Sequence, residues 1–347
     1  MLPKVQIIKV LGNLTLSIIV GGQYGDEGKG KITSWFAKNT KLDAVVRAGT
    51  GPNAGHTVVV DGTVFKLRII PSGFFADAKI YIGAGMLVTE KIFHEEVELT
   101  NIKDRIFLDH NTGVITEEHV ASERADNHLM KNIGSTGSGC GTANVDRIRR
   151  KLKVAHEYES LVPYITNVSH ELNAILDRGG NILIEGSQAT FLSLYHGNYP
   201  YTTSKDVSAA GALSDVGIGP TRVDEVILVL KSFVTRVGAG ELNGEISEDE
   251  VRANGWEEFG TVTGRLRRAA PFDYDLARRA VSINGATKIA LTKVDILYPD
   301  VSGKTDQNDL TPDALEFIKS IEEATKVPVR YISTGPAANE LIVRKTN

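Results

Sequence analysis

The stretch LTLSIIVGGQYGDEGKGK, residues 14–31, indicates the fold class. Residues 14–20 are apolar and rich in β-branched side chains, which is typical of a buried strand. Residues 32–39, ITSWFAKN, have a helical pattern, and glycines and two lysines lie between the two segments. A glycine-rich turn from a strand into a helix N-terminus binds anions, because free backbone N–H groups point at the ligand. The stretch therefore predicts an α/β protein with a phosphate-binding loop.

This loop is close to a P-loop but departs from it at one position. Gly25 to Lys31 reads G-x-x-x-x-G-K, and Ile32 follows where a P-loop has the Ser or Thr that binds magnesium. Two acids, Asp26 and Glu27, also lie in the loop, although negative charge repels phosphate. A tight turn with solvated lysines would need the same glycines, so the loop alone leaves both interpretations open.

The rest of the chain alternates between strand and helix patterns. Further strands are expected at 181–186, 226–233, 288–295 and 329–333, and amphipathic helices at 89–100 and 312–325. Thr311 and Pro312 form a suitable N-cap and first turn for the last helix. This alternation predicts a mostly parallel central sheet flanked by helices, with a P-loop-like nucleotide-binding architecture.

Composition narrows the class of protein. The chain has 347 residues, 41% of them hydrophobic, with a net charge of −4, so it offers no basic field for nucleic acid or for an acidic membrane. Its single cysteine, Cys140, allows no internal disulfide, and no apolar run is long enough for a membrane span. We expect a cytoplasmic protein (host cytoplasm if phage-encoded) made of one domain, 1–347, with 1–13 as an N-terminal extension.

Four other loops combine glycine, hydroxyl and charged residues. Residues 49–57 read GTGPNAGHT and residues 134–143 read GSTGSGCGTA, which suggests more than one phosphate-bearing group. Residues 261–268, TVTGRLRR, hold three arginines, whose planar guanidinium groups match carboxylates and phosphates. Residues 292–295, TKVD, end in Asp295, which could accept the N1–H and N2–H₂ of guanine. Flexible glycine loops, a solvated basic face and a surface turn are the structural alternatives.

Taken together, these loops resemble the adenylosuccinate synthetase family. The chain carries the motifs in the family's order: GDEGKGK, NAGHT, STGSG, EGSQ, YPYTTS, TRVGAG, TGRLRR, TKVD and STGP. The likeness extends from about residue 15 to about residue 340, and its compact length resembles the archaeal branch and its phage relatives. The resemblance implies a ligase in which GTP phosphorylates O6 of a purine nucleotide and the amine of L-aspartate then displaces that phosphate.

The resemblance also implies roles for individual residues. Asp26 matches the base that takes the proton from purine N1, which would explain an acid in a phosphate loop. Asp26 and the carbonyl of Gly55 match the ligands of Mg²⁺. His56 matches a general acid at the transferring phosphoryl group, and Lys29 matches the lysine that holds phosphate.

Binding residues follow in the same way. Those for the purine monophosphate are Asn53, Thr136, Arg150, Gln188, Thr203, Val237 and Arg265. Those for L-aspartate are Thr261, Thr263, Arg265 and Arg267. Those for GTP are Gly25, Glu27, Gly28, Lys29, Gly30, Thr57, Lys293, Asp295, Ser333 and Gly335. Arg150 matches a residue that reaches the nucleotide phosphate of a partner subunit, which implies a homodimer.

One departure from the family bears on the acceptor nucleotide. The family's Pro-Phe-Pro-Thr-Glu is replaced by ELNGE at 241–245. Phage members that accept GMP or dGMP and make 2-aminoadenylosuccinate alter the same region. Glu241 and Asn243 could accept a hydrogen bond from a purine 2-amino group, so both IMP and GMP or dGMP remain possible acceptors.

Two other function classes compete with the ligase. A P-loop GTPase switch would account for the loop and TKVD, but not for Ile32 or for the arginine-rich segment. An inactive nucleotide sensor would not need Asp26, Lys29 and His56 together.

Overall fold

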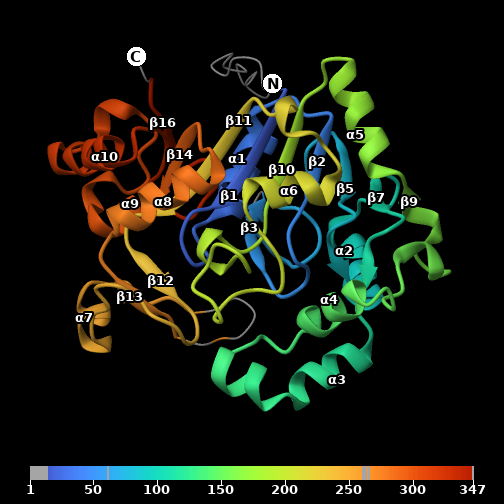
Figure 1. The fold of residues 1–347 in the computed structure, drawn as a ribbon. Helices are drawn as coiled ribbons and strands as arrows, with labels where there is room; N and C mark the ends of the chain where they lie inside the picture. Colours follow the sequence, from blue (N-terminus) through green and yellow to red (C-terminus); the bar gives the residue numbers. More distant parts are fainter. Residues whose placement is uncertain (1–14, 61, 260–263, 265, 346–347) are drawn as a thin grey trace.

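The computed structural model describes residues 15–60, 62–259, 264 and 266–345. Its centre is a ten-stranded sheet, with β1 in the interior between β10 and β11 (Figure 1). In spatial order its strands are β16 (Leu341–Val343), β15 (Val329–Ser333), β14 (Lys288–Thr292), β11 (Glu225–Lys231), β1 (Leu16–Gly21), β10 (Ile182–Glu185), β2 (Ala44–Arg47), β5 (Lys79–Ile82), β7 (Ile106–Asp109) and β9 (Ile165–Thr166). Every neighbouring pair is parallel except β15 and β16. The predicted mostly parallel sheet is thus confirmed.

Helices cover both faces of this sheet. The helices of the described residues are α1 (Lys29–Asn39), α2 (Glu90–Thr100), α3 (Glu117–Ala125), α4 (Cys140–Ile148), α5 (Val168–Asp177), α6 (Ala209–Val216), α7 (Glu248–Ala253), α8 (Tyr274–Asn284), α9 (Val294–Leu297) and α10 (Pro312–Thr325). Of these, α3, α4 and α7 pack on the marginal elements instead of on the sheet (Figure 1). Side chains of β1 alternate between two cores, as expected of a strand buried on both sides. Ile18 and Val20 pack in the core that contains α5, α6, α8 and α10, whereas Ile19 packs with α1 and α2.

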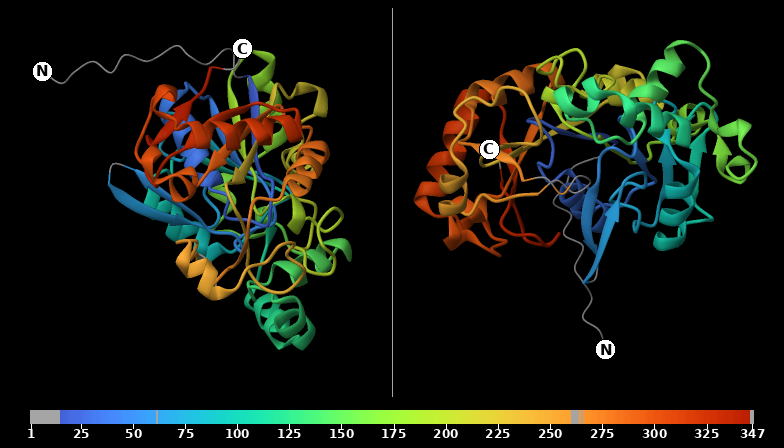
Figure 2. Two further views of the ribbon diagram at one scale, coloured as in Figure 1. Left: turned by 90° about the vertical axis from the view of Figure 1, so that its left-hand side faces the viewer. Right: turned by 90° about the horizontal axis from the view of Figure 1, so that it is seen from below.

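Three two-stranded sheets extend the fold at its margins. They are β3 (His56–Val60) with β4 (Thr63–Leu67), β6 (Leu87–Val88) with β8 (Gly113–Val114), and β12 (Val234–Arg236) with β13 (Arg268–Ala270). Figure 2 shows that the β3–β4 hairpin projects from the body of the molecule. None of the helices in the described part of the chain is long and apolar enough to cross a membrane.

The predicted elements agree with the structure apart from their ends. The helix predicted at 312–325 has those limits, and the Thr311 hydroxyl accepts the N–H of Ala314 at 3.3 Å. The strand predicted at 288–295 is wrong at its end, because it stops at Thr292. Lys293 adopts a left-handed conformation with φ 61° and caps the short helix α9. The chain therefore turns at Lys293, one of the residues predicted to bind GTP.

Candidate active site

A pocket of about 1020 Å³ lies at the carboxyl ends of the parallel strands. Loops that follow β1, β2, β10, β12, β14 and β15 all contribute to its wall. In open α/β sheets ligands bind at this edge, where the loops converge. The volume is at the upper end of the range for ligand pockets, so there is room for more than one substrate.

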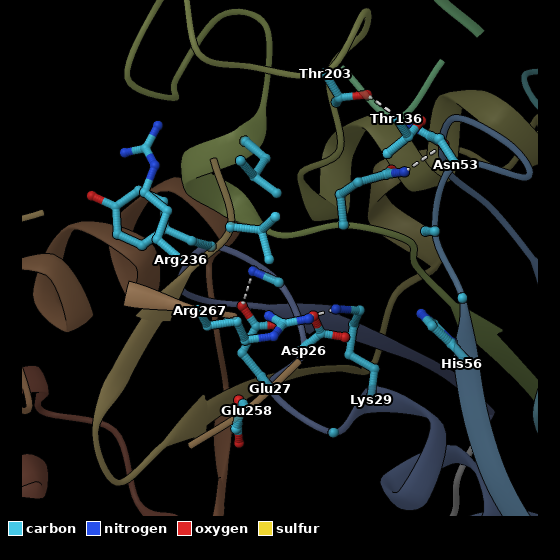
Figure 3. A pocket seen from close by; sticks show the side chains of 18 of the residues that line it. Asp26, Glu27, Lys29, Asn53, His56, Thr136, Thr203, Arg236, Glu258 and Arg267 are labelled. Atoms are coloured by element: carbon cyan, nitrogen blue, oxygen red, sulfur yellow. Dashed lines mark hydrogen bonds and ion pairs between the residues drawn. The ribbon is translucent and has the colours of Figure 1, made fainter. Parts of the chain in front are cut away.

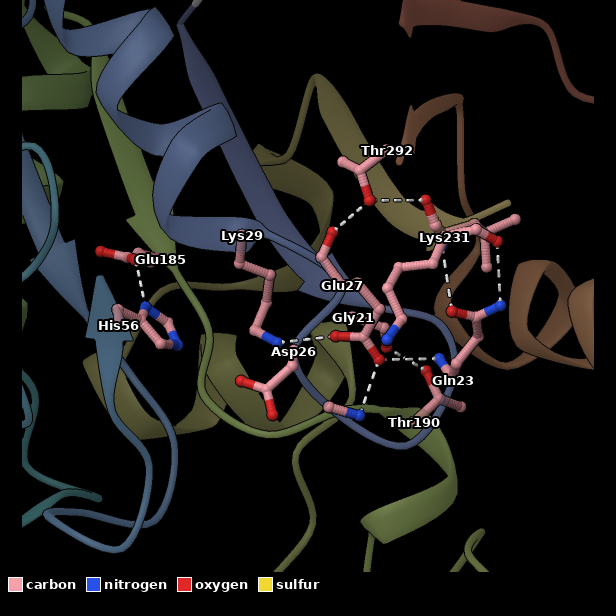
Figure 4. A network of polar contacts seen from close by, with 12 residues as sticks. Gly21, Gln23, Asp26, Glu27, Lys29, His56, Glu185, Thr190, Lys231 and Thr292 are labelled. Atoms are coloured by element: carbon pink, nitrogen blue, oxygen red, sulfur yellow. Dashed lines mark hydrogen bonds and ion pairs between the residues drawn. The ribbon is translucent and has the colours of Figure 1, made fainter. Parts of the chain in front are cut away.

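The glycine loop is organised around a buried carboxylate. Glu27 is fully buried, and its Oε1 accepts the backbone N–H groups of Gln23 (3.1 Å) and Gly25 (2.8 Å). Its Oε2 accepts a hydrogen bond from Lys29 Nζ at 2.9 Å. Figure 4 shows this carboxylate inside the curve of the loop. One of the two acids thus stabilises the loop from within, which the sequence pattern did not indicate.

Asp26 is directed into the pocket instead. Its φ of 58° lies in the left-handed region, which is uncommon for a residue other than glycine and turns the side chain away from Glu27. Its carboxylate is 35% exposed and forms an ion pair with Arg267 (Figure 3). Burial lowers the pKa of Arg267 to about 10, so the guanidinium is still charged at neutral pH.

Lys31 occupies the sequence position of the P-loop lysine, but its ammonium group is bound by the loop after β15. Its Nζ donates to Ser333 Oγ at 2.6 Å and to the carbonyls of Gly335 and Glu340. Burial lowers the pKa of Lys31 to about 8. Lys31 therefore connects α1 to the loop after β15, and Lys29 is the loop lysine that remains beside Asp26 (Figure 3).

His56 begins β3 and belongs to a buried charged cluster. Its Nδ1 contacts Glu185 Oε1, and Arg47 is 3.1 Å from the same oxygen. Ser72 donates to Glu185 from its N–H at 2.6 Å and from its hydroxyl at 2.8 Å. Burial, with the nearby charge of Arg47, lowers the pKa of His56 to about 4, although Glu185 opposes this shift. His56 lines the pocket, and Figure 4 shows its imidazole held by Glu185.

Three residues predicted to bind the purine monophosphate meet through their side chains. Gln188 Nε2 donates to Asn53 Oδ1 at 2.8 Å, and Asn53 Nδ2 donates to Thr203 Oγ1 at 3.4 Å. Thr136 lies close to them in Figure 3. Val237 also lines the pocket. These polar groups come from four separate loops, so the tertiary structure has assembled a possible base or sugar subsite.

The residues predicted to bind GTP lie on the wall that contains the ends of β14 and β15. Lys293, Asp295, Ser333 and Gly335 line the pocket there, and Gly25, Gly28, Gly30, Gly55 and Thr57 line it at the glycine loop and β3. Burial raises the pKa of Asp295. Thr261, Thr263 and Arg265 lie outside the described residues, so their predicted roles rest on the sequence.

Arg150 is exposed and is not among the residues that line the pocket. It follows the C-cap of α4, has φ 59°, and donates to the carbonyl of Ile148 at 2.6 Å. The apolar side chain of Ile148 is itself 70% exposed. An exposed Arg150 outside its own pocket is compatible with the prediction that it binds the nucleotide phosphate of a partner subunit.

The structure places Glu241 and Asn243 away from the position in which they were expected to accept a hydrogen bond from a purine 2-amino group. Glu241 and Asn243 do not line the main pocket; they line a separate cavity of about 250 Å³. Asn243 Nδ2 donates to Asp273 Oδ2 at 3.2 Å. The ring of Tyr24, with Arg236 stacked 4.5 Å from its centroid, lies on the wall of both cavities. The replaced segment therefore packs behind this wall.

Several charged residues of the site were missed by the sequence analysis. Arg47, Glu185 and Lys231 are fully buried, and each is the last residue of its strand. A charge at the end of an apolar run was the available signal, because such a charge needs a buried partner. Glu258, which also lines the pocket, had no comparable signal.

The site has the chemistry for Mg²⁺. Within the described residues there is no group of three or more His, Cys, Asp or Glu side chains that could hold a metal ion. Mg²⁺ does not need one, because it is commonly held by one or two carboxylates, waters and substrate phosphates. Asp26 and Gly55 both line the pocket, and a carboxylate with a backbone carbonyl fits such a donor set.

Comparison with known proteins identifies the family. The family model described as adenylosuccinate synthetase matches residues 18–156 and 151–300. The chain is 53% identical to adenylosuccinate synthetase from Methanocaldococcus jannaschii over 333 residues, which are 95% of this chain and 96% of the relative. The chain belongs to the adenylosuccinate synthetase family.

Other relatives agree with this assignment. Adenylosuccinate synthetase from Archaeoglobus fulgidus is 49% identical, with 94% of this chain and 97% of the relative covered. The fully ligated adenylosuccinate synthetase from Plasmodium falciparum has a TM-score of 0.87 at 26% identity, covering 96% of this chain and all of the other. The succinoaminodeoxyadenylate synthetase of cyanophage S-2L, bound to dGMP and dATP, has a TM-score of 0.79 at 26% identity, covering 96% and 97%.

Family membership decides between the function classes. Adenylosuccinate synthetases are ligases that form a C–N bond, and as a family they use GTP, L-aspartate and Mg²⁺. This chain is therefore a purine-nucleotide ligase, and the GTPase switch and the inactive sensor are set aside.

Proposed function

We propose that this chain condenses L-aspartate with IMP and converts GTP to GDP and phosphate in the process. The observation that supports the proposal most strongly is the content of one pocket. Asp26 and Lys29 line the same pocket as Asn53, Gln188 and Thr203 and as Asp295. A candidate base thus shares one pocket with the residues proposed to bind the acceptor and the donor nucleotide, and Figure 3 shows Asp26 beside Lys29.

The order of the steps is taken from the family, and the positions of these residues fit it. Asp26 takes the proton from purine N1, so that O6 becomes a nucleophile and attacks the γ-phosphorus of GTP. GDP leaves, while Lys29 stabilises the charge on the transferring phosphoryl group, and His56 donates a hydrogen bond there once phosphate charge has made it the imidazolium, with Nδ1 on Glu185. The aspartate amine, whose carboxylate binds Arg267, then attacks C6, and phosphate departs with the former O6 oxygen. Mg²⁺, when held by Asp26 and Gly55, would neutralise phosphate charge.

IMP is the proposed acceptor because nothing in the replaced segment favours a 2-amino purine. Glu241 and Asn243 line the smaller cavity behind Tyr24, so they offer no acceptor to a base in the main pocket. The archaeal relatives at about 50% identity are adenylosuccinate synthetases, whereas the phage enzyme bound to dGMP is 26% identical. GMP or dGMP remains the competing acceptor.

The acceptor is tested by comparing IMP, dIMP, GMP and dGMP at equal concentration with L-aspartate, GTP and Mg²⁺. Phosphate release is measured with and without aspartate, and the product is identified by mass. We expect the highest kcat/KM with IMP and a product with the mass of adenylosuccinate. A higher kcat/KM with GMP or dGMP would contradict the proposed acceptor and leave the ligase reaction in place.

A homodimer with a shared site is part of the proposal. Arg150 lies away from its own pocket, beside the exposed Ile148, which supports a contact with a second subunit.

We also propose that 1–347 forms one domain, because a single sheet contains both β1 and β16, with 1–13 as an extension.

The Arg150→Leu protein is expected to have a raised KM for the purine monophosphate and a nearly unchanged KM for GTP. Loss of a charge-assisted contact to phosphate costs about 1.5–3 kcal/mol, which corresponds to a KM increase of about ten- to a hundredfold. The neighbouring exposed Arg149 provides a matched control, and Arg149→Leu should leave both constants within about twofold. Steady-state kinetics measure all of these values.

Mixing experiments test the shared site directly. A heterodimer of Arg150→Leu with Asp26→Asn contains one complete site, since the first chain supplies Asp26 and the second supplies Arg150. Mixing should recover part of the wild-type activity. Heterodimers that form and recover nothing would show that Arg150 does not cross between subunits.

A further inference from the structure

Lys231 is a fully buried charge at the end of β11. Its Nζ donates to Glu258 Oε2 at 2.6 Å and to the hydroxyl of Thr235. Its backbone is fixed by Gln23, whose Oε1 accepts the Lys231 N–H at 3.0 Å. A buried ammonium group needs a paired acid. The position of the Glu258 carboxylate is therefore determined by the interior of the protein.

The other oxygen of Glu258 faces the pocket. Lys293 Nζ lies 3.3 Å from Glu258 Oε1. The Lys293 backbone is held in its left-handed turn by the Ser232 hydroxyl, which donates to its carbonyl at 2.7 Å. Asp295, the proposed guanine-reading residue, comes two positions later in the same turn. Glu258 thus restricts a flexible lysine side chain at the donor-nucleotide wall.

The main chain of Glu258 contacts Arg267, which belongs to the proposed aspartate subsite. Its carbonyl accepts the Arg267 N–H at 2.9 Å, and Phe259 pairs with Leu266 in an antiparallel bridge. Arg267 is 3% exposed and forms the ion pair with Asp26. Figure 3 shows Glu258 and Arg267 near Glu27 of the glycine loop. One residue therefore contacts both the lysine of the proposed GTP subsite and the arginine of the proposed aspartate subsite.

We propose that Glu258 is a positioning residue that couples the GTP and aspartate subsites through Lys293 and Arg267. The inference rests on the proposed function, since it takes its two ligands from it. The Lys231 ammonium fixes the Glu258 carboxylate, and this carboxylate orients the Lys293 side chain. The main-chain carbonyl of Glu258 fixes the backbone N–H of Arg267. Among the described residues, Asn53, Gln188 and Thr203 of the purine monophosphate subsite form no hydrogen bond or ion pair with Glu258, so this subsite should be independent of it.

The Glu258→Gln protein tests this coupling. The amide keeps the size of the side chain but loses the charge, so it cannot accept hydrogen bonds from both lysines with equal strength. We expect the KM for GTP to rise about tenfold and the KM for IMP less than about twofold. The KM for L-aspartate should rise less than that for GTP, about threefold, because the carbonyl that accepts the Arg267 N–H is kept and is only shifted when the side chain loses its ion pairs. The control is Glu248→Gln, the same change on the exposed surface of α7, which should leave all three constants unchanged.

A second variant separates two roles of Glu258, which are to orient Lys293 and to compensate the buried charge of Lys231. Glu258→Gln leaves Lys231 buried without a paired acid and lowers stability, whereas Lys231→Met with Glu258→Gln removes both charges and should recover the melting temperature. In that double variant Lys293 still lacks its partner, so the KM for GTP should stay raised. A return of this KM to the wild-type value would overturn the inference and reduce Glu258 to the partner of Lys231.

Direct binding of GDP, measured by calorimetry, keeps the two proposals distinguishable. A wild-type protein that does not turn over IMP, aspartate and GTP contradicts the proposed function. The role of Glu258 alone is contradicted by a different result. In that case the wild-type protein is active, and the Glu258→Gln variant binds GDP as tightly as the wild type and keeps its KM for GTP and for aspartate.

Discussion

Replacement of Asp26 by asparagine is expected to lower kcat by about 10²–10⁴, the usual contribution of a general base. The amide has the same size as the carboxylate but cannot take the proton from purine N1, so O6 stays a poor nucleophile. Asparagine also tolerates the left-handed backbone at this position, where φ is 58°, so the loop should keep its conformation.

Two measurements distinguish this loss from misfolding. The Asp26→Asn protein loses the acid paired with the buried Arg267, so its melting temperature should fall, but GDP should bind with similar affinity, because Lys29 and the loop N–H groups are unchanged. Single-turnover phosphate release at saturating Mg²⁺ reports the chemical step. Turnover within about tenfold of the wild type would remove Asp26 from the role of base.

Replacement of Asp295 by asparagine is expected to lower kcat/KM for GTP by about a hundredfold or more. The carboxylate can accept both N1–H and N2–H₂ of guanine, and hydrogen bonds to a charged group are each worth about 1.5–3 kcal/mol. Asparagine offers one acceptor and one donor, which matches the N1–H and the O2 of xanthine. The variant should therefore prefer xanthosine triphosphate over GTP.

Burial supports this assignment and defines its control. Asp295 lines the pocket, and burial raises its pKa, whereas Asp300 is exposed five residues later. Asp300→Asn should leave nucleotide preference unchanged. Equal kcat/KM values for GTP and ATP in the wild-type enzyme would show that Asp295 does not read the base.

Much of the fold could be predicted because its signals are local. The apolar run before the glycine loop becomes β1, and the helix after it begins at Lys29, where N–H groups without helical partners face the pocket. Thr311 caps α10 as its sequence indicates. The order of strands and helices then leads to a parallel sheet whose carboxyl edge gathers the loops.

The uses of individual charges were not predictable in the same way. Asp26 and Glu27 are adjacent acids, yet one faces the pocket and the other holds the loop together from inside. Lys29 and Lys31 are separated by one residue, yet Lys31 binds the loop after β15. Backbone angles and distant partners decide which side chain reaches the ligand, and a linear motif contains neither.

The sequence by itself determined the α/β class, the glycine loop and the family, because these depend on short-range patterns and on the order of motifs along the chain. Only the tertiary structure decided that Glu241 and Asn243 lie behind the pocket wall, that Glu185 supports His56, and that Glu258 joins Lys231 to Lys293. The physical reason is burial: a charge removed from water must find a partner, and the fold brings that partner from a remote part of the chain.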